Sequence, residues 1–256
     1  MKIGMMNFPA ADVIREIYFA AENGFDFVDL TIEPPLAYYD KNNPGEIKSA
    51  LNKLGMDVIG HTAYYLPIGS PVKTVRETAV CEIIKCMSFF KSIGADKINI
   101  HPDFNQPNFF SSEEKTLFNI ESLKKIVCEG QKNGIIVMLE NLNSGITEFE
   151  EIFLAIPELK FHFDMGHANL CPGPVDMEKM IRRFYDRLTH VHMSDNKGGY
   201  GDLHIPLGTG NLDWKRGVKL LKDFGYNGTI TLEIFSNDRN YLILSKEKLK
   251  SFWSRC

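Results

Sequence analysis

The sequence predicts a (β/α)8 barrel, or TIM barrel, formed by residues 1–256 as a single domain. The main observation is a recurring pattern of an amphipathic segment, a glycine, and a short β-branched or aromatic run. It reads ENG-FDFVDLTIE, KLG-MDVIGHT, SIG-ADKINIHP, KNG-IIVMLEN and DFGYNG-TITLEIF. A glycine in this place is typical of a helix C-cap that precedes a strand. Three further runs, at 2–8, 159–164 and 188–193, bring the expected strands to eight, and their alternation with helices predicts a closed parallel sheet.

Helical segments with apolar residues three and four positions apart lie between the expected strands. We expect them near residues 11–23, 46–54, 72–93, 112–133, 147–155, 176–187, 212–224 and 246–253. Ser112, Thr147 and Asp176 are the expected N-caps, because acidic residues follow each of them in the first turn. A doubly wound open sheet is the alternative fold. It more often carries a glycine-rich phosphate loop, and no GxGxxG motif is present in the sequence.

Composition limits the classes of function. Hydrophobic residues make up 44% of the chain and charged residues 24%, which is ordinary for a globular protein with a large core. The net charge of −4 disfavours nucleic acid as a partner, although it leaves room for a local basic patch. No apolar run reaches membrane-spanning length. Five scattered cysteines without a CxxC pair indicate reduced thiols and hence a cytoplasmic protein.

Alternation along the strands predicts which side chains face the barrel interior, because every second residue of a strand shares a face. Counting back from each terminal polar residue gives the expected inward rows Asp29-Thr31-Glu33, Asp57-Ile59-His61, Lys97-Asn99-His101, Ile136-Met138-Glu140, His162-Asp164, His190-His192-Ser194 and Thr229-Thr231-Glu233. The outward rows, such as Val28-Leu30-Ile32 and Ile230-Leu232-Ile234, are apolar, as strands covered by helices require.

The inward rows end in polar groups that we expect to meet at one mouth of the barrel. Six come from strand ends and three from the segments that follow: His61, His101, Glu140, Asp164, His167, His192, Asp202, His204 and Glu233. Imidazoles and carboxylates in this number suit Zn²⁺ or Mn²⁺, as one ion or more. Without a cation the carboxylates would repel one another. Any one of these groups could be a structural residue or a helix cap, and their coincidence across strands is what favours a metal site.

The stretch 188–211, LTHVHMSDNKGGYGDLHIPLGTGN, is the densest part of this pattern. Its strand carries His190 and His192, and the glycine-rich loop that follows carries Asp202 and His204. The alternative is a buried strand whose histidines are satisfied by their neighbours, followed by a solvated loop. We interpret His162 and His190, one layer lower than the strand ends, as orienting or core groups rather than direct ligands.

Four motifs resemble those of the xylose-isomerase-like barrel superfamily: LEN at 139–141, FDMGH at 163–167, VHMSDN at 191–196 and TLEIF at 231–235. This superfamily includes sugar epimerases, hydroxypyruvate isomerase, inosose dehydratase and endonuclease IV, and the resemblance covers the chain from its first strand to Glu233. In the epimerase branch it implies one divalent metal held through Glu140, Asp164, His192 and Glu233. It also implies that His167 contacts the substrate and that the two glutamates form the acid–base pair.

That branch usually carries an arginine shortly after the histidine of VHMSDN, where Lys197 is the nearest cation in this chain. The resemblance to endonuclease IV, of AP endonuclease family 2, extends to the ligands of its three-zinc cluster. All nine corresponding residues are present, namely the groups assigned above to the barrel mouth. The loops after the strands lack the arginine-rich insertions with which that enzyme penetrates DNA.

Our first functional hypothesis is a divalent-metal-dependent isomerase, epimerase or dehydratase of a small sugar or sugar phosphate. The metal would stabilise an ene-diolate while Glu140 and Glu233 remove a proton and return it. The expected substrate contacts are His167, Lys197, Glu33 and Tyr64. The aromatic residues in the loops after the strands, Tyr64 among them, could equally pack against the barrel rim.

The second hypothesis is an endonuclease IV-like phosphodiester hydrolase with a trinuclear zinc site. The full ligand set favours it, whereas the acidic composition and the short, arginine-poor loops count against a DNA substrate. On the size of the loops we place the sugar enzyme first. A non-catalytic binding barrel ranks last, because such a protein would tolerate loss of ligands and none is lost. The sequence leaves the oligomeric state open.

Overall fold

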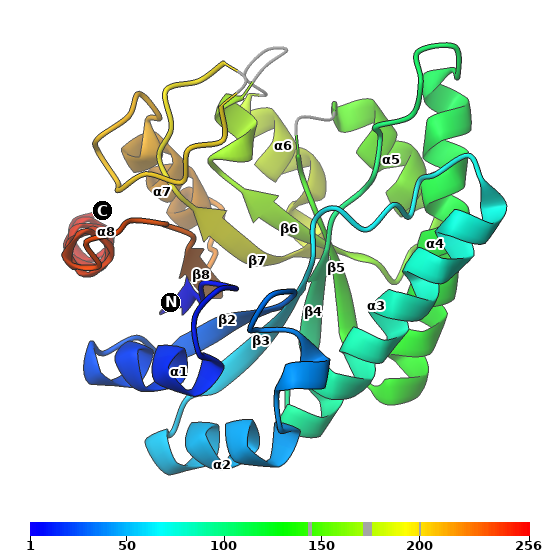
Figure 1. Ribbon diagram of the computed structural model, residues 1–256. Coiled ribbons are helices and arrows are strands. Elements are labelled where there is room, and N and C mark those ends of the chain that lie inside the picture. Colours follow the sequence, from blue (N-terminus) through cyan, green and yellow to red (C-terminus); the bar gives the residue numbers. More distant parts are fainter. Residues whose placement is uncertain (143–144, 171–175, 200) are drawn as a thin grey trace.

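Eight parallel strands close into a barrel with the helices outside it (Figure 1), in a computed structural model that describes residues 1–142, 145–170, 176–199 and 201–256. The strands pair in sequence order, and β1 closes the barrel on β8. They are β1 Lys2–Met6, β2 Phe27–Ile32, β3 Asp57–Thr62, β4 Lys97–Ile100, β5 Ile136–Glu140, β6 Lys160–Asp164, β7 Leu188–Met193 and β8 Thr229–Leu232. The predicted (β/α)8 architecture is confirmed.

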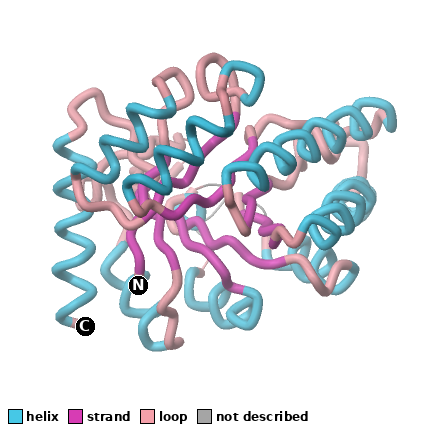
Figure 2. The backbone as a smooth tube through the Cα atoms, turned by 90° about the horizontal axis from the view of Figure 1, so that it is seen from below, coloured by secondary structure: helices cyan, strands magenta, loops and turns pink. Residues whose placement is uncertain are grey.

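The helices enclose the strands, as the view from below shows (Figure 2). They are α1 Val13–Glu22, α2 Pro44–Leu54, α3 Lys73–Ile93, α4 Ser112–Asn133, α5 Ile146–Ala155, α6 Met177–Phe184, α7 Trp214–Asp223 and α8 Asn240–Arg255. Helix-ending glycines adopt the expected left-handed conformation, with φ of 65° at Gly55 and 100° at Gly94. Among the described residues, no helix is long and apolar enough to cross a membrane.

Two helices differ from their predicted bounds by more than two residues. Helix α8 begins at Asn240, six residues before the predicted start at 246, because the nearly continuous apolar run YLIL hides the helical period. The predicted segment 176–187 divides into α6 and a 3₁₀ turn, Tyr185–Arg187, that leads into β7.

The N-caps of three helices test the capping prediction. Asp176 caps α6 as expected, since its carboxylate accepts hydrogen bonds from the backbone N–H groups of Glu178 and Lys179. Helix α4 is capped by Ser111 rather than Ser112, in a reciprocal capping box with Glu114. The prediction for Thr147 is wrong, because Gly145 is the N-cap of α5 and Thr147 lies inside that helix.

Strand parity agrees with the predicted inward and outward rows. Phe27, Ile59 and Met138 form a small apolar cluster separate from the main core, inside the barrel. Outward-facing Leu30, Phe161 and their counterparts belong to the main core, which lies between the strands and the helices. This apolar cluster occupies the lower part of the barrel interior. The inward rows end in polar residues, and because the strands are parallel these ends lie together at the upper mouth.

Helix α3 packs very closely on β3 at Gly60, and a substitution there tests this contact. A Cβ atom at Gly60 would lie 2.6 Å from Cγ of Phe90. We therefore expect Gly60→Ala to lower the free energy of unfolding by about 1–3 kcal/mol through overpacking. Gly201→Ala is the control, because a Cβ atom there would meet only ordinary contacts. Chemical denaturation measures both variants, and equal stabilities would contradict the close packing of α3.

Candidate metal centre

Six of the predicted groups are carried to the same mouth of the barrel by the ends of different strands. Glu140 pairs with His162 across β5 and β6, and Asp164 pairs with His192 across β6 and β7. All six are buried: His61, His101, Glu140, Asp164, His192 and Glu233. Since these positions lie in or directly after different strands, the barrel itself sets their spacing.

The first ligand group, which we name the central group, consists of Glu140, Asp164, His192 and Glu233. One ligand atom from each residue lies within 4.8 Å of the others. Nδ1 of His192 is 3.0 Å from Oε2 of Glu233, and 3.8 Å from both Oε1 of Glu140 and Oδ2 of Asp164. Four donors at this separation from four strand ends can surround a single cation.

A second group shares Glu140 and adds two imidazoles from β3 and the end of β4. Nε2 of His101 lies 3.0 Å from Oε2 of Glu140, and Nε2 of His61 lies 3.6 Å from the same oxygen. The two rings meet edge to face at a centroid distance of 4.9 Å. Glu140 therefore stands between two ligand groups and can bridge them.

The third group forms in loops. Nε2 of His167 and Nε2 of His204 both lie 2.9 Å from Oδ2 of Asp202. Nδ1 of His167 lies 3.0 Å from the backbone carbonyl of Asn141, which accepts its proton and leaves Nε2 directed at Asp202. The same nitrogen is 3.2 Å from Oε1 of Glu140, so this group adjoins the other two. The nine predicted groups thus come together at one mouth.

The predicted substrate contacts lie at different distances from this centre. Glu33 accepts a hydrogen bond from the hydroxyl of Thr31, on the inward row of β2. The Tyr64 side chain is 68% exposed, and its ring centroid is 6.5 Å from that of His101. Lys197 is exposed in the loop after β7, and its ammonium forms no hydrogen bond or ion pair within the described part of the chain. Glu33 and Tyr64 therefore flank the mouth, whereas Lys197 does not contact it.

Asp195 organises the loop that carries Asp202 and His204, a role that the sequence analysis missed. Its Oδ2 accepts hydrogen bonds from the N–H groups of Gly208, Thr209 and Gly210, at 2.8, 3.1 and 2.9 Å. Its backbone also forms an antiparallel bridge with residue 205. The spacing of an aspartate before a glycine-rich segment was the available signal, since closely spaced N–H groups can cradle an anion.

His204 has an uncommon backbone conformation. Its φ is 44°, and it is the one non-glycine residue with positive φ in the ranges that the structure describes. For a residue with a Cβ atom this conformation costs about 1–2 kcal/mol, so neighbouring contacts must hold it. The backbone carbonyl of His204 accepts a hydrogen bond from the N–H of Phe235, which follows β8. The strain turns the imidazole toward Asp202 and Glu233.

Two asparagines support the carboxylates and were also missed. The Asn99 side chain donates a hydrogen bond to Oε2 of Glu140, from the expected inward row of β4. The Asn141 side chain accepts from the N–H of Asp164 and donates to its carbonyl, both at 2.8 Å. Asn99 could have been found from strand parity, whereas the pairing of Asn141 with β6 needs the tertiary structure.

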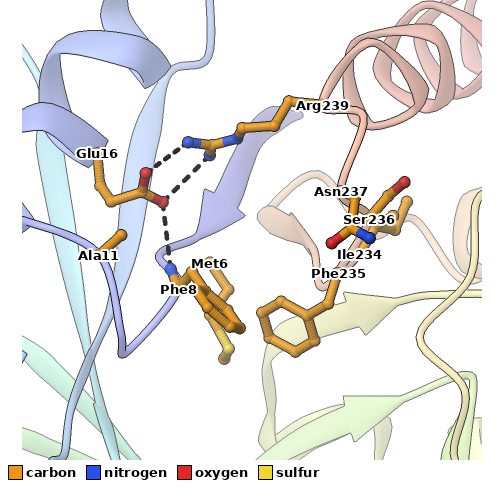
Figure 3. Close-up of a pocket in the computed structure, with 9 residues that line it drawn as sticks. All are labelled: Met6, Phe8, Ala11, Glu16, Ile234, Phe235, Ser236, Asn237 and Arg239. Atoms are coloured by element: carbon orange, nitrogen blue, oxygen red, sulfur yellow. Dashed lines mark hydrogen bonds and ion pairs between the residues drawn. The ribbon is translucent and has the colours of Figure 1, made fainter. Parts of the chain in front are cut away.

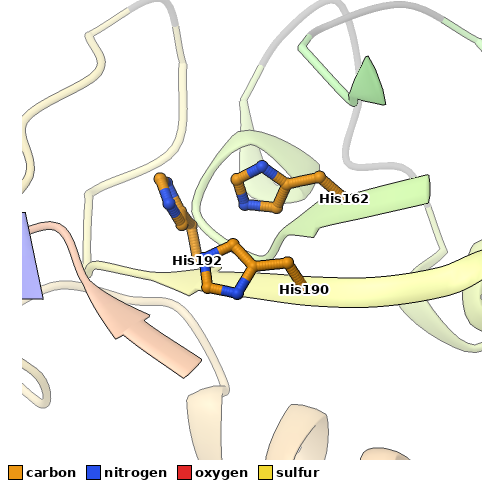
Figure 4. A group of neighbouring side chains, drawn as sticks. All are labelled: His162, His190 and His192. Carbon is orange, nitrogen blue, oxygen red and sulfur yellow. The ribbon is translucent and has the colours of Figure 1, made fainter. Parts of the chain in front are cut away.

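His162 and His190 lie beneath the central group, and their rings gather with that of His192 into a cluster of three imidazoles (Figure 4). His190 hydrogen-bonds to the hydroxyl of Thr229 at 2.7 Å and to Oδ2 of Asp29 at 3.1 Å. His162 packs against His192 with ring centroids 4.0 Å apart. The hydrogen bonds of His190 agree with an orienting role, whereas neither ring nitrogen of His162 forms a hydrogen bond.

Beside the mouth is a cavity of about 320 Å³ that the sequence analysis did not anticipate (Figure 3). The rings of Phe8 and Phe235 form one wall, with centroids 6.0 Å apart. Phe235 also lies 5.3 Å from the ring of His204, which connects the cavity to the third ligand group. Glu16 accepts hydrogen bonds from Arg239 and from the N–H of Phe8, and so ties the loop after β1 to the start of α8.

The carboxylates of the central group titrate far from their ordinary range. Burial raises the pKa of Asp164 to about 6, and repulsion from Glu140 and Glu233 acts in the same direction. Burial would also raise the pKa of Glu140, but the surrounding imidazoles, among them His101, together hold it well below its ordinary value. The protein thus distributes protons over the site so that the buried negative charges are compensated.

The imidazoles of His192 and His204 show the reverse effect. Burial would lower the pKa of His192, but its carboxylate neighbours, Glu140 foremost, hold it well above the ordinary value. Burial likewise opposes protonation of His204, while Glu233 and Asp202 raise its pKa to about 9. Because metal ligands must be deprotonated, a cation would replace these protons and take over the compensation of charge.

Unpartnered atoms test whether a metal fits this site. The buried side-chain atoms that form no hydrogen bond include Nδ1 and Nε2 of His61, Nδ1 of His101, Oε1 of Glu140, Oδ2 of Asp164 and Nδ1 of His204. Buried polar atoms are normally satisfied, and leaving them without a partner is costly. Nitrogen and carboxylate donors are the ligands that Zn²⁺ and Mn²⁺ accept, so the residues fit a divalent metal.

Comparison with known proteins identifies the family. The sequence profile of the family described as xylose isomerase-like TIM barrel matches residues 17–251. The chain belongs to this family. An L-ribulose 3-epimerase from Methylomonas sp. is 27% identical over 249 residues, which cover 90% of this chain and 80% of the relative. A probable endonuclease 4 from Thermosipho melanesiensis is 29% identical over 193 residues, which cover 66% of this chain and 65% of the relative.

A solved structure of a D-tagatose 3-epimerase-like protein has the same fold. It superposes with a TM-score of 0.84 over 99% of this chain and 97% of that chain, at 24% sequence identity. The predicted superfamily and fold are therefore confirmed. Together the relatives support an enzyme of the sugar isomerase and epimerase kind.

Removal of the metal provides a test of the site. We expect Zn²⁺ or Mn²⁺ to raise the thermal unfolding midpoint of chelator-stripped protein, since an ion at 100 times its Kd adds about 2.7 kcal/mol of stability. Glu140→Gln should lose most of this shift, because Glu140 belongs to two ligand groups. Asp57→Asn is the control, with its exposed carboxylate at the start of β3. Equal shifts in both variants would contradict the assignment of Glu140.

Proposed function

We propose that this protein is a divalent-metal-dependent epimerase or isomerase of a small sugar or sugar phosphate. The observation that carries the proposal is the central group, in which Glu140 and Glu233 approach one point from β5 and the end of β8. The similarity to an L-ribulose 3-epimerase and to a D-tagatose 3-epimerase-like structure over nearly the whole chain supports it.

A divalent cation held by the central group would stabilise the negative charge that develops on substrate oxygens when a carbon-bound proton is removed. The two glutamates supply the proton transfer. Both have pKa values below the ordinary range despite their burial, so either can act as the base. A substrate carbon between them would lose its proton to one carboxylate and receive a proton from the other, which inverts or relocates the stereocentre.

The remaining side chains would bind and orient the substrate. His167 is fixed by Asn141 and Asp202, so its ring has a defined position beside the central group. Glu33 and Tyr64 flank the mouth and are suited to contact substrate hydroxyl groups. The assignment of Lys197 as a substrate contact stays a prediction. Burial of the two glutamates limits competing exchange of their protons with bulk water.

Isosteric amides test the roles of the glutamates. We expect Glu140→Gln and Glu233→Gln each to reduce turnover by about 10²–10⁴-fold, because a carboxamide cannot accept the substrate proton. The assay is exchange of carbon-bound hydrogen with deuterated water across a panel of ketoses. Glu121→Gln is the matched control, because the exposed Glu121 carboxylate pairs with Arg76 on the helices and belongs to none of the ligand groups. If Glu233→Gln keeps full turnover with an intact fold, the assignment of Glu233 to proton transfer is wrong.

A second candidate function is an endonuclease IV-like phosphodiester hydrolase with a trinuclear zinc site. The specific observation in its favour is that the two outer groups also hold three ligand atoms each within 4.8 Å. Several zinc ions would activate the attacking water and stabilise the leaving oxygen. The 29% identity to a probable endonuclease 4 supports this candidate as well. The net charge of −4 counts against a polyanionic substrate.

Metal content and product analysis separate the two candidates. The epimerase predicts about one ion per chain at full activity, whereas the hydrolase predicts two or three. Elemental analysis of the purified protein gives the ratio. In parallel, cleavage of an abasic-site oligonucleotide is measured beside hydrogen exchange on the ketose panel. Cleavage at three zinc ions per chain without any exchange would replace the epimerase proposal with the hydrolase.

A further inference from the structure

Asp29 is a buried carboxylate inside the barrel, one layer below the central group. Its Oδ2 lies 2.7 Å from Nε2 of His192, 3.1 Å from Nε2 of His190 and 2.9 Å from the hydroxyl of Thr231. Its Oδ1 forms no hydrogen bond. Asp29 is fully buried, so these contacts are its whole polar environment among the described residues.

The contact between Asp29 and His192 is not imposed by strand pairing. Asp29 is on β2 and His192 is on β7, and these strands are not neighbours in the barrel. The hydrogen bond therefore crosses the interior and joins residues 163 positions apart in the chain. A carboxylate that is fully buried inside the barrel is unfavourable unless hydrogen-bond donors compensate its charge, and His190, His192 and Thr231 are those donors.

The two nitrogens of His192 face different partners. Nε2 points to Asp29, while Nδ1 points to Glu233 and the rest of the central group. A carboxylate can only accept a hydrogen bond, and a neutral imidazole carries one N–H. Both nitrogens face carboxylates in this structure. With a metal held at the central group, the lone pair of Nδ1 would be directed to it, and the one proton of His192 would stay on Nε2, where Asp29 accepts it.

We propose that Asp29 is a positioning residue that fixes the tautomer and ring orientation of His192 and strengthens Nδ1 as a metal ligand. His190 and Thr231 in turn hold the carboxylate in place through the same oxygen. Carboxylate partners of ligating histidines commonly act in this way. The inference rests on the metal site of the proposed function, but it is independent of which reaction the site performs.

The decisive experiment is calorimetric titration of the full-length, chelator-stripped protein with Zn²⁺ and with Mn²⁺. Asp29→Asn keeps the size of the side chain and removes its charge, and we expect affinity to fall by about 10–100-fold. Asp57→Asn is the matched control, because it makes the same substitution at an exposed carboxylate that touches none of the ligand groups. Affinity of that control should stay within about threefold of wild type. Thermal unfolding of each metal-free variant reports any purely structural loss.

The outcomes distinguish this inference from the proposed function. If the wild-type protein binds neither ion, the proposed metal site fails and the inference fails with it. If wild type binds and Asp29→Asn binds equally well, only the role of Asp29 is overturned. The same holds if both variants lose stability and affinity to the same degree, since Asp29 would then be a structural residue alone.

A measurement on the wild-type protein decides the question if Asp29→Asn does not fold. Nitrogen-15 NMR of the histidine rings identifies the protonated nitrogen, and His192→Gln assigns the signal by its loss. We expect the zinc-loaded protein to show His192 with its proton on Nε2. A proton on Nδ1 would overturn the proposal.

Discussion

Carboxylates and imidazoles are crowded at the mouth of the barrel, and the mutual compensation of their charges is the interaction on which the site depends. Burial raises the pKa of Asp164 to about 6, while neighbouring carboxylates hold the pKa of His192 well above its ordinary value. Neither effect would arise for a solvated residue. The same electrostatic field that distributes protons over these groups would draw in a divalent cation, which can neutralise several carboxylates at once.

The barrel meets this constraint with two kinds of support. The central group stands on strand ends, so hydrogen bonding between β5, β6, β7 and β8 fixes its spacing. The third group stands on a loop and needs other means, namely the N–H cradle around Asp195 and the left-handed backbone of His204. Sites on rigid elements are held more accurately than sites on loops. The third group is therefore the part of the centre that depends most on how its loop is held.

Glu140 links the ligand groups and illustrates why one scaffold can suit different chemistries. It belongs to the central group and to the pair His61 and His101, and it adjoins His167. With the central group alone occupied, the carboxylates of Glu140 and Glu233 are suited to proton transfer. With all three groups occupied, the same residues would serve a multinuclear centre. The fold is common to both cases, and under either proposal the function would depend on which groups hold ions.

The sequence by itself determined the barrel and the nine groups at its mouth, because strand periodicity and strand-end position are local properties of the chain. Parity assigned His61, Glu140 and Glu233 to the interior without any knowledge of their neighbours. Only the tertiary structure decided how these groups divide into three clusters and which atoms support them. The bond from Asp29 to His192 joins strands that are not paired, and the cradle of Asp195 depends on how its loop closes. Such contacts arise from distances across the folded molecule, which no local pattern encodes.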